Sequence, residues 1–60
     1  MTDDLERLIR ATYNNARLLQ LSPEEAFEKA VEMMLRHRPL LSAEEARAEV
    51  AKILKDAPAD

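Results

Sequence analysis

Residues 21–37 read LSPEEAFEKAVEMMLRH, and this stretch decides the fold. It opens with the strongest helix-start signal in the chain: Ser22 can cap a helix, Pro23 suits its first position, and a glutamate follows three residues after the cap. Pro39 ends the helix, because a residue that precedes proline is sterically pushed out of the helical region. The sequence therefore predicts a helix over residues 23–37.

Apolar residues cover an unusually wide part of this helix. At about 100° per residue they form two adjacent stripes that together span roughly 200°, twice the face of an ordinary surface helix. One stripe contains Ala26, Ala30, Met33, Met34 and His37, and the other contains Phe27, Val31 and Leu35. A helix this apolar must be covered on two sides. Either it lies between two other helices, or one stripe packs internally and the other meets a partner chain.

Two further helices are predicted on either side of this one. Residues 3–20 carry an amphipathic stripe at spacings of three and four, with Thr2 or Asp3 as the cap. Asn14-Asn15 is the weak point of this helix, because asparagine is a poor residue for a helix interior. Residues 43–56 follow a second Ser-x-x-Glu start signal and carry a stripe of Ala46, Val50, Ile53 and Leu54.

Short connections between these segments favour helices that pack as sequential neighbours. The expected fold class is all-α: a compact three-helix bundle with helices at about 3–20, 23–37 and 43–56, formed by residues 1–60 as a single domain. The chain resembles de novo designed bundles in two respects: it has no Gly, Cys or Trp, and its capping boxes are regular. Tyr13-Asn14-Asn15 and the methionine pair do not fit an idealised design, and natural origin is the preferred interpretation.

Small size limits the core. A 60-residue chain buries only about 60% of the surface that its unfolded form exposes, so its stability is marginal. The chain has no Cys and one His, which excludes disulfides and argues against a structural zinc, and no cofactor is expected. Oligomerisation is the remaining way for so small a domain to gain stability.

Net charge and hydropathy limit the classes of partner that the chain is expected to bind. The net charge is −3, from 9 basic and 12 acidic residues, whereas nucleic-acid binders normally carry a basic surface. No apolar run approaches the roughly 20 residues that span a bilayer, so no membrane association is expected. The N-terminal Met1-Thr2-Asp3-Asp4 is acidic where a signal peptide would be basic, which favours the cytoplasm.

Catalytic chemistry finds little support in the sequence. Ser22 and Ser42 are the only serines, and both stand at helix N-caps. His37 lies between Arg36 and Arg38, where all three suit the negative end of a helix dipole. The carboxylates mostly occupy first helical turns or pair with bases four residues away. The chain is therefore not expected to be an enzyme, and no small-molecule substrate can be named.

Self-association is the main functional hypothesis. Three helices cannot easily cover each other and also hide Leu18, Leu40 and Leu41, so one stripe of the second helix is expected to meet another copy. The expected product is a homodimer, because closed two-fold symmetry is the commonest arrangement. The residues predicted to form the interface are Leu18, Phe27, Val31, Met34 and Leu35.

Two alternatives remain open at this point. The same face could be buried on a different protein, which would make the chain an adaptor or inhibitor. The second and third helices could also form a helix-turn-helix-like arrangement in a small DNA-associated regulator. Glu44 and Glu45 would then face the phosphates with only Arg47 to oppose them, which makes nucleic-acid binding the weaker alternative.

Overall fold

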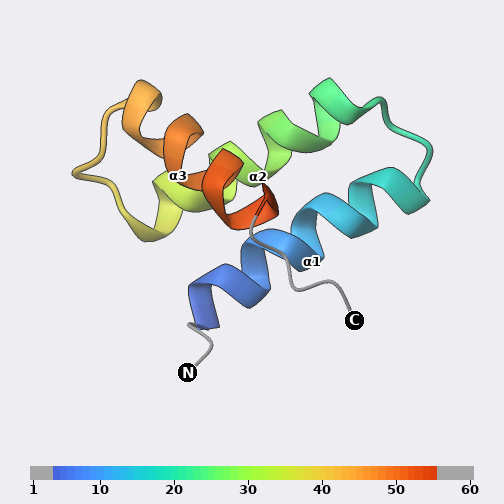
Figure 1. Ribbon diagram of the computed structural model, residues 1–60, viewed down its shortest axis with the longest axis horizontal. Coiled ribbons are helices and arrows are strands. Elements are labelled where there is room, and N and C mark those ends of the chain that lie inside the picture. The colour runs from blue at the N-terminus through green and yellow to red at the C-terminus, as the bar shows by residue number, and fades with distance from the viewer. Residues whose placement is uncertain (1–3, 56–60) are drawn as a thin grey trace.

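The computed structural model describes residues 4–55, which form three α-helices joined by short turns (Figure 1). These helices are α1 (Asp4–Leu18), α2 (Pro23–His37) and α3 (Ala43–Lys55). The all-α, three-helix expectation is thereby confirmed over the described residues. The predicted bounds of α2 agree with the structure, while the outer ends predicted at Asp3 and Asp56 lie outside the described residues.

Two serine caps begin α2 and α3 as the sequence predicts. Ser22 Oγ accepts the backbone N–H of Glu25 at 3.2 Å, and Ser42 Oγ accepts that of Glu45 at 3.1 Å. Only the second cap is a complete capping box, because the Glu45 carboxylate also accepts the backbone N–H of Ser42 at 3.0 Å. These bonds supply partners to N–H groups that a helix start leaves without one.

The end of α1 departs from the prediction. Helical geometry stops at Leu18 rather than residue 20, because Gln20 adopts a left-handed conformation with φ 69°. The Leu21 N–H then donates to the Ala16 carbonyl at 3.1 Å and the Gln20 N–H to the Arg17 carbonyl at 2.9 Å. This pair of bonds is the Schellman motif, which usually places glycine at the left-handed position.

Asn14-Asn15, the weak point of the predicted helix, does not interrupt α1, which is continuous from Asp4 to Leu18. Both asparagine side chains are exposed, so water can satisfy their amides without competition for the helix backbone. Thr12, one turn earlier, also stays helical and bonds its hydroxyl to the Leu8 carbonyl at 2.8 Å.

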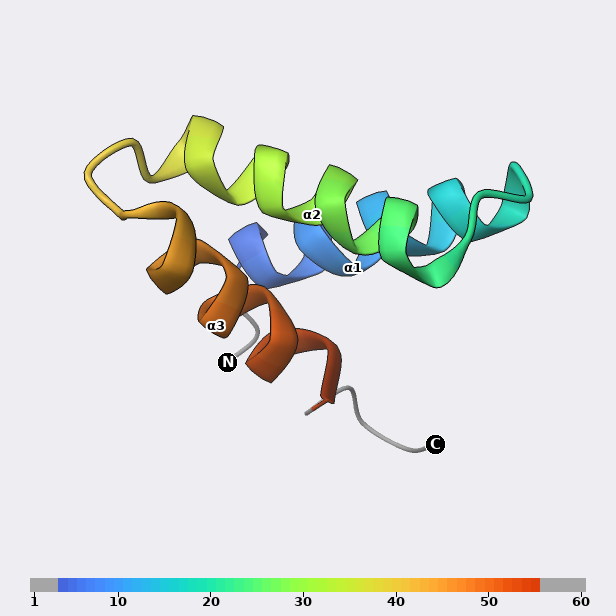
Figure 2. The same ribbon diagram turned by 90° about the horizontal axis from the view of Figure 1, so that it is seen from above.

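Figures 1 and 2 show α1 and α2 running antiparallel side by side, with α3 crossing one side of the pair. The molecule is flat, with extents of 30 × 27 × 15 Å. α2 packs against both other helices, whereas α1 and α3 touch each other least. The wide apolar face of α2 is therefore covered from two sides within one chain, as the central-helix interpretation predicted.

The core is built from small residues. All three helices contribute to it, and the buried apolar residues are Ile9, Ala16, Ala26, Ala30, Val31, Met34, Ala46 and Val50. Half of these are alanines, which let helices approach closely but bury little surface each. Several larger side chains stay outside: Leu18, Leu19 and Leu40 are 80%, 75% and 98% exposed.

We predict that Ile9→Ala lowers the free energy of unfolding by about 2–5 kcal/mol, because it empties one of the few large volumes in the core. Ile9→Val should cost only about 0.5–1.5 kcal/mol. Leu40→Ala is the matched surface control and should change stability by less than about 0.5 kcal/mol. Urea unfolding followed by circular dichroism measures all three, and equal losses at Ile9 and Leu40 would contradict this core.

Gln20→Gly should stabilise the chain by roughly 0.5–1 kcal/mol. Glycine has no Cβ to clash in the left-handed conformation that Gln20 adopts, although its greater freedom in the unfolded chain offsets part of the gain. Gln20→Ala keeps the Cβ and should leave stability nearly unchanged. If both variants gave the same unfolding midpoint in urea, the left-handed turn would not be present in solution.

Candidate interaction site

The structure scatters the five residues predicted for the interface. Val31 and Met34 are 5% and 3% exposed and belong to the core. Phe27 and Leu35 are half-buried against that core, and Leu18 is exposed at the end of α1. The second stripe of α2 is thus largely occupied within the chain, because α3 lies over it.

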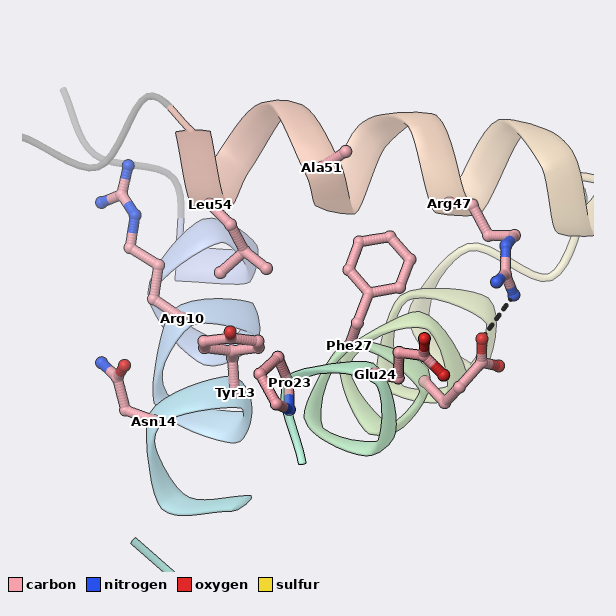
Figure 3. Close-up of a pocket in the computed structure, with 10 residues that line it drawn as sticks. Arg10, Tyr13, Asn14, Pro23, Glu24, Phe27, Arg47, Ala51 and Leu54 are labelled. Atoms are coloured by element: carbon pink, nitrogen blue, oxygen red, sulfur yellow. Dashed lines mark ion pairs between the residues drawn. The ribbon is translucent and has the colours of Figure 1, made fainter. Parts of the chain in front are cut away.

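A groove between the three helices has a volume of about 850 Å³ (Figure 3). We call it the three-helix groove. Its lining residues are Arg10, Tyr13 and Asn14 of α1, Pro23, Glu24, Phe27 and Glu28 of α2, and Arg47, Ala51 and Leu54 of α3. The chain's only two aromatic side chains both face this space.

Helical spacing explains why these side chains share one space. Pro23 and Phe27 lie four residues apart on α2, and Ala51 and Leu54 lie three apart on α3, so each pair projects from one helix face. Figure 3 shows the Phe27 ring directed toward Ala51, while Leu54 points toward Tyr13. The floor of the groove is therefore apolar and is assembled from all three helices.

Arg47 connects α3 to α2 at one edge of the groove. Its guanidinium lies 2.6 Å from a Glu28 carboxylate oxygen, and its Cζ lies 5.6 Å from the centre of the Phe27 ring. The first contact is an ion pair and the second is within cation–π range. Both side chains of the ion pair are about half exposed, so the pair orients α3 more than it stabilises it.

Arg10, on the α1 wall, keeps unused donors. Its Nε is buried and has no hydrogen-bond acceptor within residues 4–55. The nearest carboxylate is that of Glu6, whose oxygen lies 3.7 Å from an Arg10 Nη, too far for a good hydrogen bond. Glu24 stands on the α2 wall, and Figure 3 shows it on the other side of the groove from Arg10.

A second, smaller hollow of about 210 Å³ lies near the other end of α2. It is lined by Leu5, Glu6, Met34, Arg38, Leu41, Glu49, Lys52 and Ile53. Charged side chains make up half of this lining, and it holds no aromatic ring. The three-helix groove is accordingly the better candidate for binding apolar side chains.

The groups considered for chemistry lie outside the three-helix groove. Ser22 and Ser42 cap helices, and His37 is exposed at the C-terminal end of α2. Within the described residues no three His, Cys, Asp or Glu side chains come together as a metal site would require. Nor is any described helix both long and apolar enough to cross a bilayer.

The surface that a helix-turn-helix would present to DNA is acidic at its leading end. Glu44 and Glu45 occupy the first turn of α3, as the sequence predicts. Arg47, the only base expected to oppose them, is directed to Glu28 and Phe27 instead. This surface has no base left in that turn to neutralise a phosphate.

The groove cannot be predicted from the sequence, because its lining comes from three separate helices. Tyr13 and Phe27 stand 14 residues apart on different helices, so the apolar pattern of neither helix predicts that they meet. The direction in which α3 crosses the α1–α2 pair decides which side chains line the groove, and no local sequence pattern encodes that direction.

Comparison with protein-family models, with curated proteins and with solved structures found no match to this chain.

The Arg47–Glu28 ion pair can be measured by a double-mutant cycle with Arg47→Met and Glu28→Gln. We expect a coupling energy of roughly 0.2–1 kcal/mol in urea unfolding, because both groups are half exposed. The coupling should shrink in about 1 M NaCl, where the Debye length is near 3 Å. A coupling of zero at low salt would show that α3 is not held against α2 at this point.

Proposed function

We propose that this chain is a non-enzymatic protein–protein interaction module that self-associates, with a homodimer as the product. The observation that carries the proposal is the distribution of side-chain size. Half of the buried apolar residues are alanines, while three leucines are at least 75% exposed and both aromatic rings line an open groove. A marginal domain that keeps large apolar groups at its surface gains most from association.

The energetic argument is one of scale. Covering one exposed leucine completely contributes about 1.5–3 kcal/mol, which is a large part of the stability of a domain this small. A second copy is always present at the concentration of the chain itself. Association that buries even a few of these side chains would therefore raise stability by mass action.

The composition of the groove supports protein as its ligand. Tyr, Phe and Arg are enriched in protein interfaces, and all three are present in its lining. Burial of this same groove on a different protein is the second candidate, since a groove between helices also suits an amphipathic helix. A cytoplasmic location remains part of the proposal.

The test is the solution mass, measured by light scattering on a size-exclusion column across a dilution series. The chain mass is 6.9 kDa, so self-association predicts twice this mass at high concentration. On dilution the measured mass should fall toward that of the single chain. A mass of 6.9 kDa at every concentration would contradict self-association. The groove would then await a different protein.

A further inference from the structure

The charges of the three-helix groove balance within its own lining. Two arginines and two glutamates line it, so its formal net charge at neutral pH is zero although the whole chain carries −3. A strongly charged ligand, such as a nucleic acid or a basic peptide, gains no net attraction from such a lining. The groove suits a partner whose charges are mixed in the same way.

One ion pair accounts for half of these charges. Arg47 and Glu28 neutralise each other on the same side of the groove. The other two charged residues of the lining stand on opposite sides of the groove, Arg10 on α1 and Glu24 on α2 (Figure 3). The Arg10 guanidinium has only the long Glu6 ion pair at 3.7 Å, and its Nε has no hydrogen-bond partner within residues 4–55.

We infer that two copies of the chain meet groove to groove about a two-fold axis, with Arg10 of each chain against Glu24 of the other. This inference rests on the proposed self-association and names its surface. In a two-fold interface, if one residue contacts another across the axis, the reverse contact exists as well. Opposite charges on opposite walls are therefore self-complementary, and one rotation forms two ion pairs.

The shape of the groove agrees with this rotation. Figure 3 shows α3, with Ala51 and Leu54, at one end of the groove, and Asn14 and Pro23 toward the opposite end. The two-fold axis that exchanges the α1 and α2 walls, and so brings Arg10 to Glu24, places α3 of one copy over α3 of the other. Exposed Ala51 presents only a methyl group there and allows α3 to approach closely.

The aromatic rings then lie near the centre of the interface. Phe27 is half-buried in the single chain and would be covered by the second copy, which is where interface anchors concentrate. The two charge pairs would stand at the rim of this apolar centre. Rim charges select the partner and its orientation, and a matching pattern on the second copy favours the chain itself.

The experiment reverses one charge of the groove in each of two variants. In a homodimer of the Arg10→Glu variant, a glutamate at position 10 faces Glu24 of the other chain at both contacts. In a homodimer of the Glu24→Arg variant, Arg10 faces an arginine at both contacts. Each variant alone should dimerise at least about tenfold more weakly than the wild type. Mixed in equal amounts, they should form a heterodimer of near wild-type affinity, because both contacts then pair Glu with Arg. Light scattering on a dilution series gives the affinities.

Two exposed residues of α2 that do not line the groove provide the matched control. Arg36→Glu and Glu32→Arg change the net charge by the same amounts, and their mixture should show no preference for the heterodimer. Circular dichroism checks that each variant is as helical as the wild type. If Arg10→Glu is not, Arg10→Gln replaces it and should also weaken the dimer and gain affinity when mixed with Glu24→Arg.

Two failures can be told apart. A wild-type chain that dimerises while the Arg10 and Glu24 variants dimerise equally well, or do not recover on mixing, overturns the groove-to-groove interface but leaves self-association standing. A wild-type chain that stays at 6.9 kDa throughout overturns both. A heterodimer preference of the control pair equal to that of the groove pair would also overturn the inference, because net charge alone would then explain it.

Discussion

Because α2 is apolar over roughly half of its circumference, it needs a helix on each of two sides, and the rest of the structure depends on this constraint. α1 lies along one side and α3 crosses the other, so the chain uses both stripes internally. Alanines at the contacts let these helices approach closely. The three-helix groove follows directly, because a helix that crosses a pair at an angle leaves an open space on one side of the crossing.

The helices could be read from the sequence because their signals are local. Ser22 and Ser42 each form a cap that involves only the next three residues, and Pro39 stops α2 by a clash with its immediate neighbour. The end of α1 was placed two residues late, because Gln20 takes a conformation that sequence rules reserve for glycine. An apolar stripe does not reveal which neighbour covers it. Val31 and Met34, which the stripe pattern predicts at an interface, lie in the core of the single chain.

The groove depends on information that no single segment carries. Arg10, Phe27 and Leu54 come from three helices and share one space only after α3 has crossed α2. The same crossing directs Arg47 to Glu28 and Phe27, which removes it from the acidic surface at the start of α3. A chain with a thin core and an open, charge-balanced groove is one whose folding and association we expect to be linked, with each copy completing the burial that the other lacks.

The central claim is that association contributes to the stability of the fold, and the dependence of unfolding on chain concentration tests it most directly. Urea unfolding of the wild-type chain, followed by circular dichroism over a hundredfold range of concentration, gives a midpoint at each concentration. We expect the midpoint to rise steadily with concentration, because dimers that bind only folded chains favour folding by mass action. A midpoint that stays constant over the whole range would contradict the account, since the fold would then owe nothing to a second copy.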